Sequence, residues 1–260
     1  MAVFKIATWN VNSLKVRLEH VLEWLKTTQP DVLALQEIKM QTADFPIDVF
    51  REAGYHAVVS GQKTYNGVAI LSKQPAHIET VLTDFPGYVD EQRRVLGVEI
   101  NGVFILNLYV PNGSEVGSDK YLYKLIWLDH LKNHLASILN KHQKVIVLGD
   151  FNIAPTNEDV HDPELWRGQI LVSDKERAAW QSILNLGLID CYKKLPVGET
   201  KYSWWDYRQA AFRRDMGLRI DHVVANAMMA DHLQGCEIDK VPRTWERPSD
   251  HAPVIANFIF

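Results

Sequence analysis

Cysteines and long apolar runs are scarce in this sequence. Cys191 and Cys236 are its two cysteines, and neither lies at a spacing typical of metal ligands. The sequence shows no secretory signal and no continuous apolar stretch of membrane-spanning length. We therefore expect both cysteines to be reduced thiols packed as small core side chains, in a cytoplasmic protein that has no membrane partner.

Several motifs that would define other activities are also missing. The chain has no Walker loop and no G-x-G-x-x-G run, which argues against nucleotide-driven chemistry. It has no G-x-S-x-G elbow, which argues against a serine nucleophile. Lysine and arginine number 28 against 32 aspartate and glutamate residues, so the net charge is −4. Any phosphate-binding surface must therefore be a local patch.

Linkers and repeats are absent as well. No stretch rich in proline, glycine or serine divides the chain, and no segment recurs at a fixed period. Hydrophobic residues make up 47% of the chain and charged residues 23%, which is typical of a soluble globular protein. We therefore predict one domain over residues 1–260, long enough to bury roughly three quarters of its unfolded surface.

Helical patterns alternate with short β-prone runs along the chain. Apolar residues at helical spacing predict a helix over residues 14–25 and a long helix after Ser118. The sequence Ser173-Asp-Lys-Glu176 has the form of a capping box, which predicts another helix start.

Apolar, β-branched runs predict the strands. They fall at residues 3–9, 32–35, 57–60, 68–72, 94–100, 103–110, 145–152, 202–208, 217–225 and 254–260. Asn101-Gly102 is a tight-turn pair and predicts a hairpin between two of these runs. Strands that alternate with helices and also form hairpins predict an α/β fold with two packed mixed sheets flanked by helices.

The sequence Val145-Ile-Val-Leu-Gly-Asp-Phe-Asn152 is the most informative stretch. Its four apolar residues predict a short buried strand that Gly149 ends. Alternate side chains of an extended chain share a face, so Asp150 and Asn152 point the same way while Phe151 enters the core. An Asx turn that merely closes the strand is the structural alternative. A buried strand that ends in an acid and an amide is also how α/β proteins build sites.

Polar side chains stand at the ends of other apolar segments too. They are Asn10, Asn12, Glu37, Tyr109, Asp221, Asp250 and His251. Each could simply close a strand at the surface, but an acid such as Glu37 beside a buried strand calls for a cation nearby. If these ends converge, oxygen ligands without cysteine favour Mg²⁺ or Mn²⁺ over zinc. Such a site suits phosphoryl transfer, with a carboxylate or histidine activating a water.

Six motifs carry a family resemblance. They are Thr8-Trp-Asn-Val-Asn12, Leu35-Gln-Glu37, Asn66-Gly-Val-Ala69, Gly149-Asp-Phe-Asn152, Gly217-Leu-Arg-Ile-Asp221 and Ser249-Asp-His-Ala-Pro253. They resemble the exonuclease III family of abasic-site DNA repair nucleases, within the endonuclease/exonuclease/phosphatase superfamily. L-Q-E, G-D-F-N and S-D-H occur across the superfamily, which includes lipid and inositol phosphodiesterases. Trp204-Trp-Asp-Tyr207 followed by G-L-R-I-D is more particular to the DNA repair branch.

The resemblance implies a four-layered α/β sandwich with a divalent metal at one edge. Glu37 would bind the metal with Asn10 nearby, and Asp250 would support the metal site. Asn12 is neutral where some relatives carry an acidic residue, so we assign it to substrate binding.

The resemblance also implies roles in catalysis. Asp150 would position or deprotonate the attacking water, and Asn152 would hold the scissile phosphate. His251, oriented by Asp221, would stabilise the pentacovalent state, and Tyr109 would lie against the phosphate or the leaving oxygen. The division of the base role among Asp150, Tyr109 and His251 stays open.

Substrate-binding residues follow from the same resemblance. In relatives, the positions of Trp204, Leu218 and Ile220 wall a pocket for a flipped sugar that has lost its base, which costs less to extrude than an intact nucleotide. On the residues alone they are ordinary core side chains, with one of Trp204 and Trp205 buried and the other exposed. His222 has no assigned role, and we expect a packed imidazole there.

Arginines and aromatics are interleaved near this motif. They are Arg208, Arg213, Arg214 and Arg219 with Tyr207 and Phe212. Without the resemblance a solvated basic loop is the default; with it, the cluster suits phosphate contacts and insertion into a duplex. Lys63 and Arg93 are weaker candidates for contacts to the DNA backbone.

The overall prediction is a DNA phosphodiesterase that uses Mg²⁺ or Mn²⁺. It would act as a monomer on double-stranded DNA with an abasic site, a nick or a 3′ end. A bulky residue in segment 156–172, such as Trp166, would exclude an internal abasic site yet admit a frayed 3′ end. The alternatives are a phospholipid or inositol phosphate phosphodiesterase, and a DNA-binding protein without catalysis, which would lack competent catalytic residues.

Overall fold

The computed structural model describes residues 3–88, 90–195 and 200–260. Its helices are α1 (Leu14–Thr28), α2 (Ile47–Glu52), α3 (Asp119–Lys141), α4 (Asp174–Leu184), α5 (Cys191–Lys194) and α6 (Ala227–Ala230). Its strands are β1 (Val3–Asn10), β2 (Val32–Gln36), β3 (His56–Ser60), β4 (Val68–Ser72), β5 (His77–Leu82), β6 (Val95–Ile100), β7 (Val103–Tyr109), β8 (Val145–Asp150), β9 (Leu188–Asp190), β10 (Asp221–Asn226), β11 (Leu233–Ile238) and β12 (Val254–Ile259).

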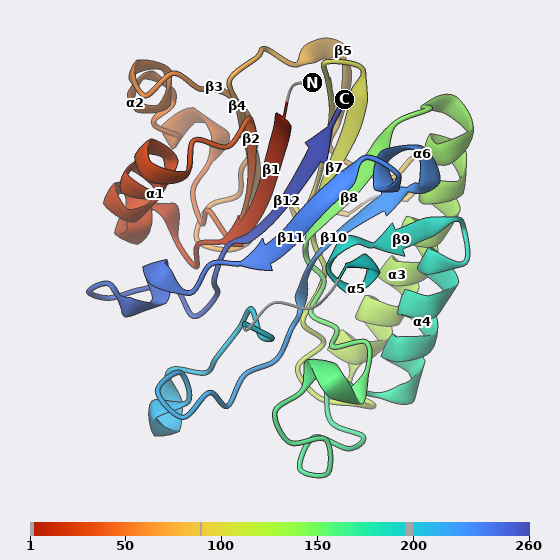
Figure 1. Cartoon of the computed structure of the whole chain (residues 1–260). Helices are drawn as coiled ribbons and strands as arrows, with labels where there is room; N and C mark the ends of the chain where they lie inside the picture. The colour runs from red at the N-terminus through yellow and green to blue at the C-terminus, as the bar shows by residue number, and fades with distance from the viewer. Residues whose placement is uncertain (1–2, 89, 196–199) are drawn as a thin grey trace.

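The strands form two six-stranded mixed sheets. One has the order β11-β12-β1-β2-β4-β3 and the other the order β5-β6-β7-β8-β10-β9. The sheets pack face to face, with α1 and α2 outside the first and α3 and α4 outside the second (Figure 1). This is the predicted four-layered α/β sandwich.

Alternation of side chains along the strands builds three apolar layers. Between the sheets, Ile6 and Ala34 of the first sheet pack with Ile105 and Ile146 of the second. The intervening residues of the strands face outward and meet the apolar sides of the helices, as Trp24 does in α1. Both faces of each sheet are therefore covered, which explains why the central strands have continuous apolar sequences.

Strand direction gathers particular chain positions at one edge. β1 and β2 run parallel, and so do β7 and β8, so each pair ends at the same edge of its sheet. β12 is antiparallel to β1, and β10 is antiparallel to β8, so these two strands begin where the others end. Asp150 consequently lies opposite Tyr109 on one side and Asp221 on the other.

A buried polar bridge joins the sheets below this edge. Gln36 donates from Nε2 to Asn107 Oδ1 across the interface at 2.7 Å. Asn107 in turn donates to the carbonyls of Leu35 and Ala69 at 3.0 and 2.9 Å. Since both side chains are fully buried and hydrogen-bonded, the bridge fixes the position of one sheet against the other.

Most predicted elements are confirmed, and one region is wrong. The capping box of Ser173 and Glu176 starts α4, and Ser118 caps α3 through Tyr121 N. Residues 202–208 do not form the predicted strand: Trp204 makes only isolated bridges to Leu218 and His251. The predicted strand over 217–225 begins at Asp221. Residues 202–220 lie outside the sheet and form a loop that turns outward beside the strand ends (Figure 1).

Cys191 and Cys236 are both free thiols, as predicted. Burial raises the pKa of the Cys191 thiol, so it packs as a neutral side chain. Among the described residues, none of the helices combines the length and apolarity that a membrane crossing requires.

Candidate active site

The strand ends bring a cluster of polar side chains together. Asn10 ends β1, Glu37 follows β2 and Asp150 ends β8. His251 precedes β12 on an isolated bridge to Trp204. Asn10, Asp150 and His251 are almost completely buried, whereas Glu37 is partly exposed and opens the cluster to solvent.

Asn10 links the two sheets at this edge. Its Nδ2 donates to Glu37 Oε1 and to Asp150 Oδ2, both at 2.9 Å. Its Oδ1 accepts a hydrogen bond from the backbone N–H of Asn12 at 3.0 Å. With every polar atom of the amide engaged, the two carboxylates are held close together at fixed positions.

The turn after β8 orients Asp150 and Asn152. Asp150 Oδ1 accepts the backbone N–H of Asn152 at 2.9 Å, and Asn152 Nδ2 donates to Val110 O at 3.0 Å. Gly149 is required before the turn, because a Cβ there would lie 1.9 Å from Leu108 O. The predicted acid and amide therefore share one face of the site, and Phe151 is buried in the core as expected.

His251 and Asp221 form a buried pair. His251 Nδ1 lies 2.9 Å from Asp221 Oδ2, which also accepts from the Ser203 hydroxyl at 2.7 Å. Burial disfavours the imidazolium, but the carboxylates of Asp221 and Asp150 outweigh it and raise the pKa of His251 to about 10. The ring is therefore protonated at neutral pH and can donate from Nε2, which lies 3.8 Å from Asp150 Oδ2.

For Asp150, burial outweighs the stabilising effect of the neighbouring groups on the charged form. Burial raises its pKa to about 7, against the lowering effect of His251 and the Asn10 amide, while Asp221 adds to the rise. A carboxylate with a pKa near neutrality is suited to accept a proton from water.

Tyr109 lies at the end of β7 on the other side of Asp150. Burial and the negative charge of Glu37 raise its pKa well above the usual tyrosine value, so the phenol stays protonated at neutral pH. The Arg94 guanidinium carbon lies 4.6 Å from the centre of its ring and packs over it. The protonated Tyr109 phenol can therefore donate a hydrogen bond at this edge.

Several residues at this edge have a strained backbone. Asn12, Glu37, Lys39 and Asn152 all have left-handed backbone conformations, with φ between 44° and 53°. Such conformations cost free energy in residues other than glycine and cluster at functional sites. Lys39 was not singled out from the sequence, yet its Nζ lies 3.0 Å from Glu37 Oε2 and donates to Asn12 Oδ1 at 2.6 Å.

The cluster has the donor atoms for a metal ion. Glu37, Asp150 and His251 each offer one ligand atom, and these atoms lie within 4.8 Å of one another. Two carboxylates suit a hard cation. Asn10 turns its N–H₂ group toward this point, so it would have to rotate its amide to act as a ligand.

Asp250 and Asn12 lie together beside this cluster. Asp250 Oδ1 accepts from Asn12 Nδ2 at 2.9 Å, and its Oδ2 accepts from the Trp204 indole at 3.0 Å. Asp250 therefore positions two residues predicted to bind substrate, and its support of a metal site stays a prediction.

The predicted walls of the sugar pocket lie at different depths. Trp204 is partly exposed and Trp205 is fully buried, as expected for this pair. Leu218 and Ile220 are also fully buried and pack beneath Trp204 in a small apolar cluster. They support the Trp204 face, which is the part of this group that a substrate can reach.

The predicted DNA-contacting residues lie on surface loops. Tyr207 and Arg208 are exposed, and Phe212 packs edge-on against Trp205 with its ring partly buried. Lys63 is exposed on a separate loop, and Arg93 donates to Asp84 at 3.1 Å.

Arg219 does not belong to the exposed basic cluster. It is 1% exposed, pairs with Asp159 at 2.7 Å and with Asp190 at 2.8 Å, and cannot reach a phosphate. Its guanidinium also lies 2.9 Å from His222 Nδ1, so His222 is the packed imidazole that was expected. Arg213 and Arg214 are exposed and remain available for phosphate contacts.

Two contacts to predicted site residues had no signal in the sequence. Ser203 orients Asp221 from a loop, and Lys124, buried in α3, donates to Asn152 O at 2.6 Å. A serine in an irregular segment and a lysine among helical leucines both have common structural explanations. Only the contacts made in three dimensions distinguish them.

A carboxylate pair, a donor amide and a protonated His–Asp pair at the edge of a two-sheet α/β sandwich define a hydrolase of the phosphoesterase class. The chain belongs to the endonuclease/exonuclease/phosphatase family, whose model matches residues 7–251. It is 33% identical over 267 residues to exodeoxyribonuclease III of Haemophilus influenzae, covering 98% of this chain and 99% of that protein.

Solved structures show the same similarity. The 3′ phosphatase NExo from Neisseria, bound to a product DNA hairpin, has a TM-score of 0.96 at 43% identity and covers 99% of this chain and 100% of its own. An AP endonuclease from Archaeoglobus fulgidus has a TM-score of 0.94 at 37% identity, with 99% and 100% covered. The fold and the nuclease-type hydrolase class predicted from the sequence are thereby confirmed.

Proposed function

We propose that the protein is a Mg²⁺-dependent DNA repair phosphodiesterase that cuts at abasic sites or removes nucleotides and blocking groups from 3′ ends. The arrangement that carries this proposal is Asp150, held by Asn10 and by the turn at Asn152, with the protonated His251 ring 3.8 Å away. A proton acceptor and a cationic donor thus lie side by side. Relatives named as exodeoxyribonuclease, 3′ phosphatase and AP endonuclease support DNA as the substrate.

The reaction follows from these two groups. A water oxygen forms a bond to phosphorus, and its proton passes to the Asp150 carboxylate. The bond from phosphorus to the leaving 3′ oxygen breaks, and this oxygen takes up a proton from solvent water to give the 3′ hydroxyl. His251 Nε2–H meanwhile donates a hydrogen bond to a non-bridging phosphate oxygen, whose negative charge grows in the transition state. The raised pKa of His251, about 10, keeps the ring protonated near neutral pH, and the raised pKa of Asp150, about 7, lets this carboxylate take a proton there.

Asn152 and Tyr109 complete the contacts to the phosphate. The Asn152 amide can rotate its N–H₂ group from Val110 O toward a phosphate oxygen. The Tyr109 phenol, kept protonated by its surroundings, donates to the phosphate or to the leaving oxygen.

A divalent ion fits beside Glu37. Glu37 would hold it, with Asn10 and Asp250 nearby, and it would neutralise phosphate charge while Asp150 takes the proton of the water. Glu37 contacts Lys39 and the Asn10 amide, so an ion bound there would replace these contacts.

The DNA would lie along the edge where the strands end. Segments 156–172 and 204–216 both project from this edge (Figure 1). The second segment carries the exposed Tyr207, Arg208, Arg213 and Arg214. Arginines there would contact phosphates, and Asn12, Lys63 and Arg93 would extend the contact along the backbone.

The test uses two labelled duplexes in Mg²⁺, each with and without chelator. One carries a single internal abasic-site analogue, and the other has a nick with a blocked 3′ terminus. Cleavage of the first defines an abasic endonuclease, whereas cleavage of the second alone defines a 3′-end-cleaning enzyme. An increase in the first activity after Trp166→Ala would show that segment 156–172 excludes internal sites.

Two outcomes would overturn the proposal. One is the absence of chelator-sensitive cleavage of either duplex. The other is hydrolysis of phosphoinositide vesicles or inositol phosphates without cleavage of DNA, which would assign the same catalytic groups to the lipid and inositol branch. A Glu37→Ala variant should lose activity on any true substrate, which identifies the contribution of a contaminating nuclease.

A further inference from the structure

Arg17 connects three chain segments beside the catalytic cluster. Its Nε donates to Arg247 O at 3.2 Å, and its Nη1 donates to Asn12 O. Its Nη2 donates to Pro248 O at 3.0 Å and to the Tyr207 hydroxyl at 3.1 Å. These partners belong to the loop before β12, the turn after β1 and the loop before β10. Within the described part of the chain, all of them are neutral oxygen atoms, so Arg17 joins loops rather than neutralising an acid.

The place of Arg17 in its helix is locally unfavourable. Helix α1 begins at Leu14, and Arg17 lies in its first turn with φ of −113° and ψ of 16°, outside the helical range. A positive charge is disfavoured near a helix N-terminus. This turn contains no acidic residue, and the Ser13 side chain makes no capping hydrogen bond. Helix formation therefore does not explain an arginine here, whereas the contacts that it makes outside the helix do.

The Arg17 guanidinium has little capacity left for a DNA phosphate. Of the five N–H groups of an arginine, the one on Nε, one on Nη1 and both on Nη2 are engaged, which leaves one. Its planar fork of donors suits several carbonyls at once, as a lysine ammonium does not. Arg17 thus differs from Arg213 and Arg214, which are exposed and remain available to the substrate.

The loop that Arg17 holds before β12 leads directly to His251. Arg247 has a left-handed backbone conformation, with φ of 51°, which costs free energy in a residue other than glycine. The guanidinium binds the carbonyl of this residue and that of the next one along the chain. Ser249 follows, and its hydroxyl donates to Asn10 O at 2.7 Å and accepts from the backbone N–H of His251 at 3.2 Å. A continuous series of hydrogen bonds therefore runs from Arg17 to the catalytic histidine.

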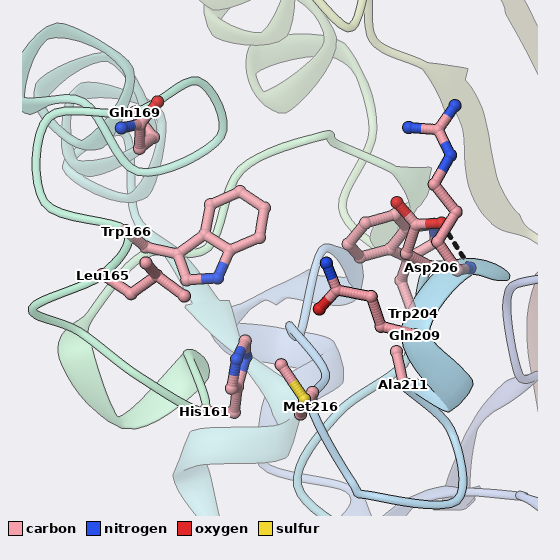
Figure 2. A pocket seen from close by; sticks show the side chains of 10 residues that line it. His161, Leu165, Trp166, Gln169, Trp204, Asp206, Gln209, Ala211 and Met216 are labelled. Carbon is pink, nitrogen blue, oxygen red and sulfur yellow. Dashed lines mark hydrogen bonds between the residues drawn. The ribbon is translucent and has the colours of Figure 1, made fainter.

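Tyr207 extends the same hydrogen-bond series to a second loop. Its hydroxyl accepts from Arg17 and donates to Pro248 O at 2.8 Å, so the two side chains share one carbonyl. Tyr207 belongs to the loop that carries Trp204, which lies across a pocket from Trp166 (Figure 2). The loops before β10 and before β12 are thus joined at one point by the Arg17 guanidinium.

We propose that Arg17 is a positioning residue for the phosphodiesterase reaction: it fixes the turn before Ser249 and thereby holds His251 beside Asp150. This inference rests on the proposed function and adds a residue on which the rate of its chemical step depends. Arg17 does not touch the reacting atoms. Its removal should therefore slow the chemical step much more than it weakens the binding of DNA.

The test measures single turnovers in Mg²⁺, with saturating enzyme and whichever labelled duplex the wild-type protein cleaves. Arg17→Ala should lower the limiting rate constant about tenfold, while the Kd for the duplex in chelator changes by less than about threefold. A smaller folded fraction changes only the concentration needed for saturation and leaves the limiting rate constant as it is. Lys15→Ala removes the same charge from an exposed position of α1 and is the matched control, with an unchanged limiting rate constant.

Chemical rescue tests whether the guanidinium itself is required. Millimolar guanidinium chloride should raise the limiting rate constant of Arg17→Ala above its value in the same concentration of sodium chloride, and should leave the wild-type rate constant unchanged. Arg17→Lys keeps the charge but loses the planar fork of donors, so it should recover only part of the loss.

Hydrogen exchange gives a readout that does not depend on activity. Without DNA, the backbone amides of residues 247–252 should exchange faster in Arg17→Ala than in the wild-type protein, whereas those of β8 should exchange equally in both. An unchanged limiting rate constant, with or without weaker DNA binding, would overturn this inference, and so would equal exchange of residues 247–252. Either result leaves the proposed function intact. Failure of the wild-type protein to cleave either duplex in Mg²⁺ would instead overturn the proposed function, and this inference with it.

Discussion

Asp221 and His251 are 30 residues apart in sequence, yet Oδ2 of the first lies 2.9 Å from Nδ1 of the second. The carboxylate holds the imidazole in one orientation and keeps a proton on Nδ1. It also contributes to the raised pKa of His251, because a buried negative charge favours the imidazolium. The cationic form of the ring therefore depends on a residue that does not need to touch the substrate.

Asp221→Asn should distinguish the negative charge of Asp221 from its hydrogen bond to His251. The amide keeps a hydrogen-bonding group but removes the negative charge, so the pKa of His251 should fall and the high-pH limb of kcat should move to lower pH. We expect kcat to fall by about 100-fold or more. Ser203→Ala keeps the carboxylate and is the control, with a smaller loss and an unshifted profile. Identical pH profiles for Asp221→Asn and the wild-type enzyme would show that the negative charge of Asp221 does not determine the pKa of His251.

Arg219 and Arg213 should respond oppositely to removal. Arg219 is buried between Asp159 and Asp190, so Arg219→Ala removes the buried cation that both carboxylates share and leaves Asp159 with Lys193, at 3.2 Å, as its cationic contact. We expect it to lower the free energy of unfolding by about 3–5 kcal/mol. Arg213→Ala is exposed and should change stability by less than about 0.5 kcal/mol. Urea unfolding measures both.

DNA binding should distinguish the same two variants in the opposite way. Arg213→Ala should weaken duplex binding and reduce the slope of log affinity against log salt by about one, as expected for a lost phosphate contact. Arg219→Ala, measured at a temperature where it is folded, should leave that slope unchanged. A reduced slope for Arg219→Ala would contradict its placement in the core.

The sequence predicts which polar side chains meet at one edge, because strand ends are local features. Asn10, Glu37, Asp150 and His251 each adjoin a short apolar run, and the direction of the strands then brings those ends to one edge. The family motifs indicated which of the polar residues at strand ends are candidate site residues. The convergence itself requires only that parallel strands end together and antiparallel strands begin there.

The contacts of charged side chains outside the strands are harder to predict. Arg219 alternates with Leu218 and Ile220, which suggests an outward direction in an extended segment. That direction leads instead to Asp159 and Asp190, from segments distant in the sequence. Lys39 contacts Glu37, and both residues have left-handed backbone conformations. Neither residue is a glycine, so the sequence does not predict these conformations. Such contacts depend on loop conformations rather than on residue pattern.

His222 should make the protein sensitive to mild acid. Burial, and the nearby Arg219 charge, lower the pKa of His222 to about 4. The unfolded chain takes up a proton near pH 6.5, so the folded state loses stability as pH falls from about 6.5 to about 4, by roughly 3 kcal/mol in total. His222→Gln should flatten the pH dependence of the unfolding free energy over that range.

The control for this pH effect is an exposed histidine. His56→Gln, at the surface of β3, should leave the pH dependence as it is in the wild-type protein. Parallel curves for His222→Gln and the wild-type protein would show that another group accounts for acid sensitivity.

Lys124 should act on catalysis through Asn152. Its ammonium is buried and donates to Asn112 O at 3.1 Å, to Asn152 O at 2.6 Å and to Glu176, which also caps α4. Lys124→Met removes the anchor of the turn that carries Asn152 and leaves the Glu176 carboxylate unpaired. We expect a loss of about 3–5 kcal/mol in stability and about tenfold in kcat, with KM little changed.

A second substitution separates the two effects of Lys124. Lys124→Met combined with Glu176→Gln removes both charges, so most of the stability should return, as measured by urea unfolding. The Asn152 carbonyl still lacks its donor in the double variant, so kcat should stay low. Recovery of kcat together with stability would mean that Lys124 only balances a buried charge, whereas a persistently low kcat in a stable protein identifies it as a residue that positions the phosphate-binding amide.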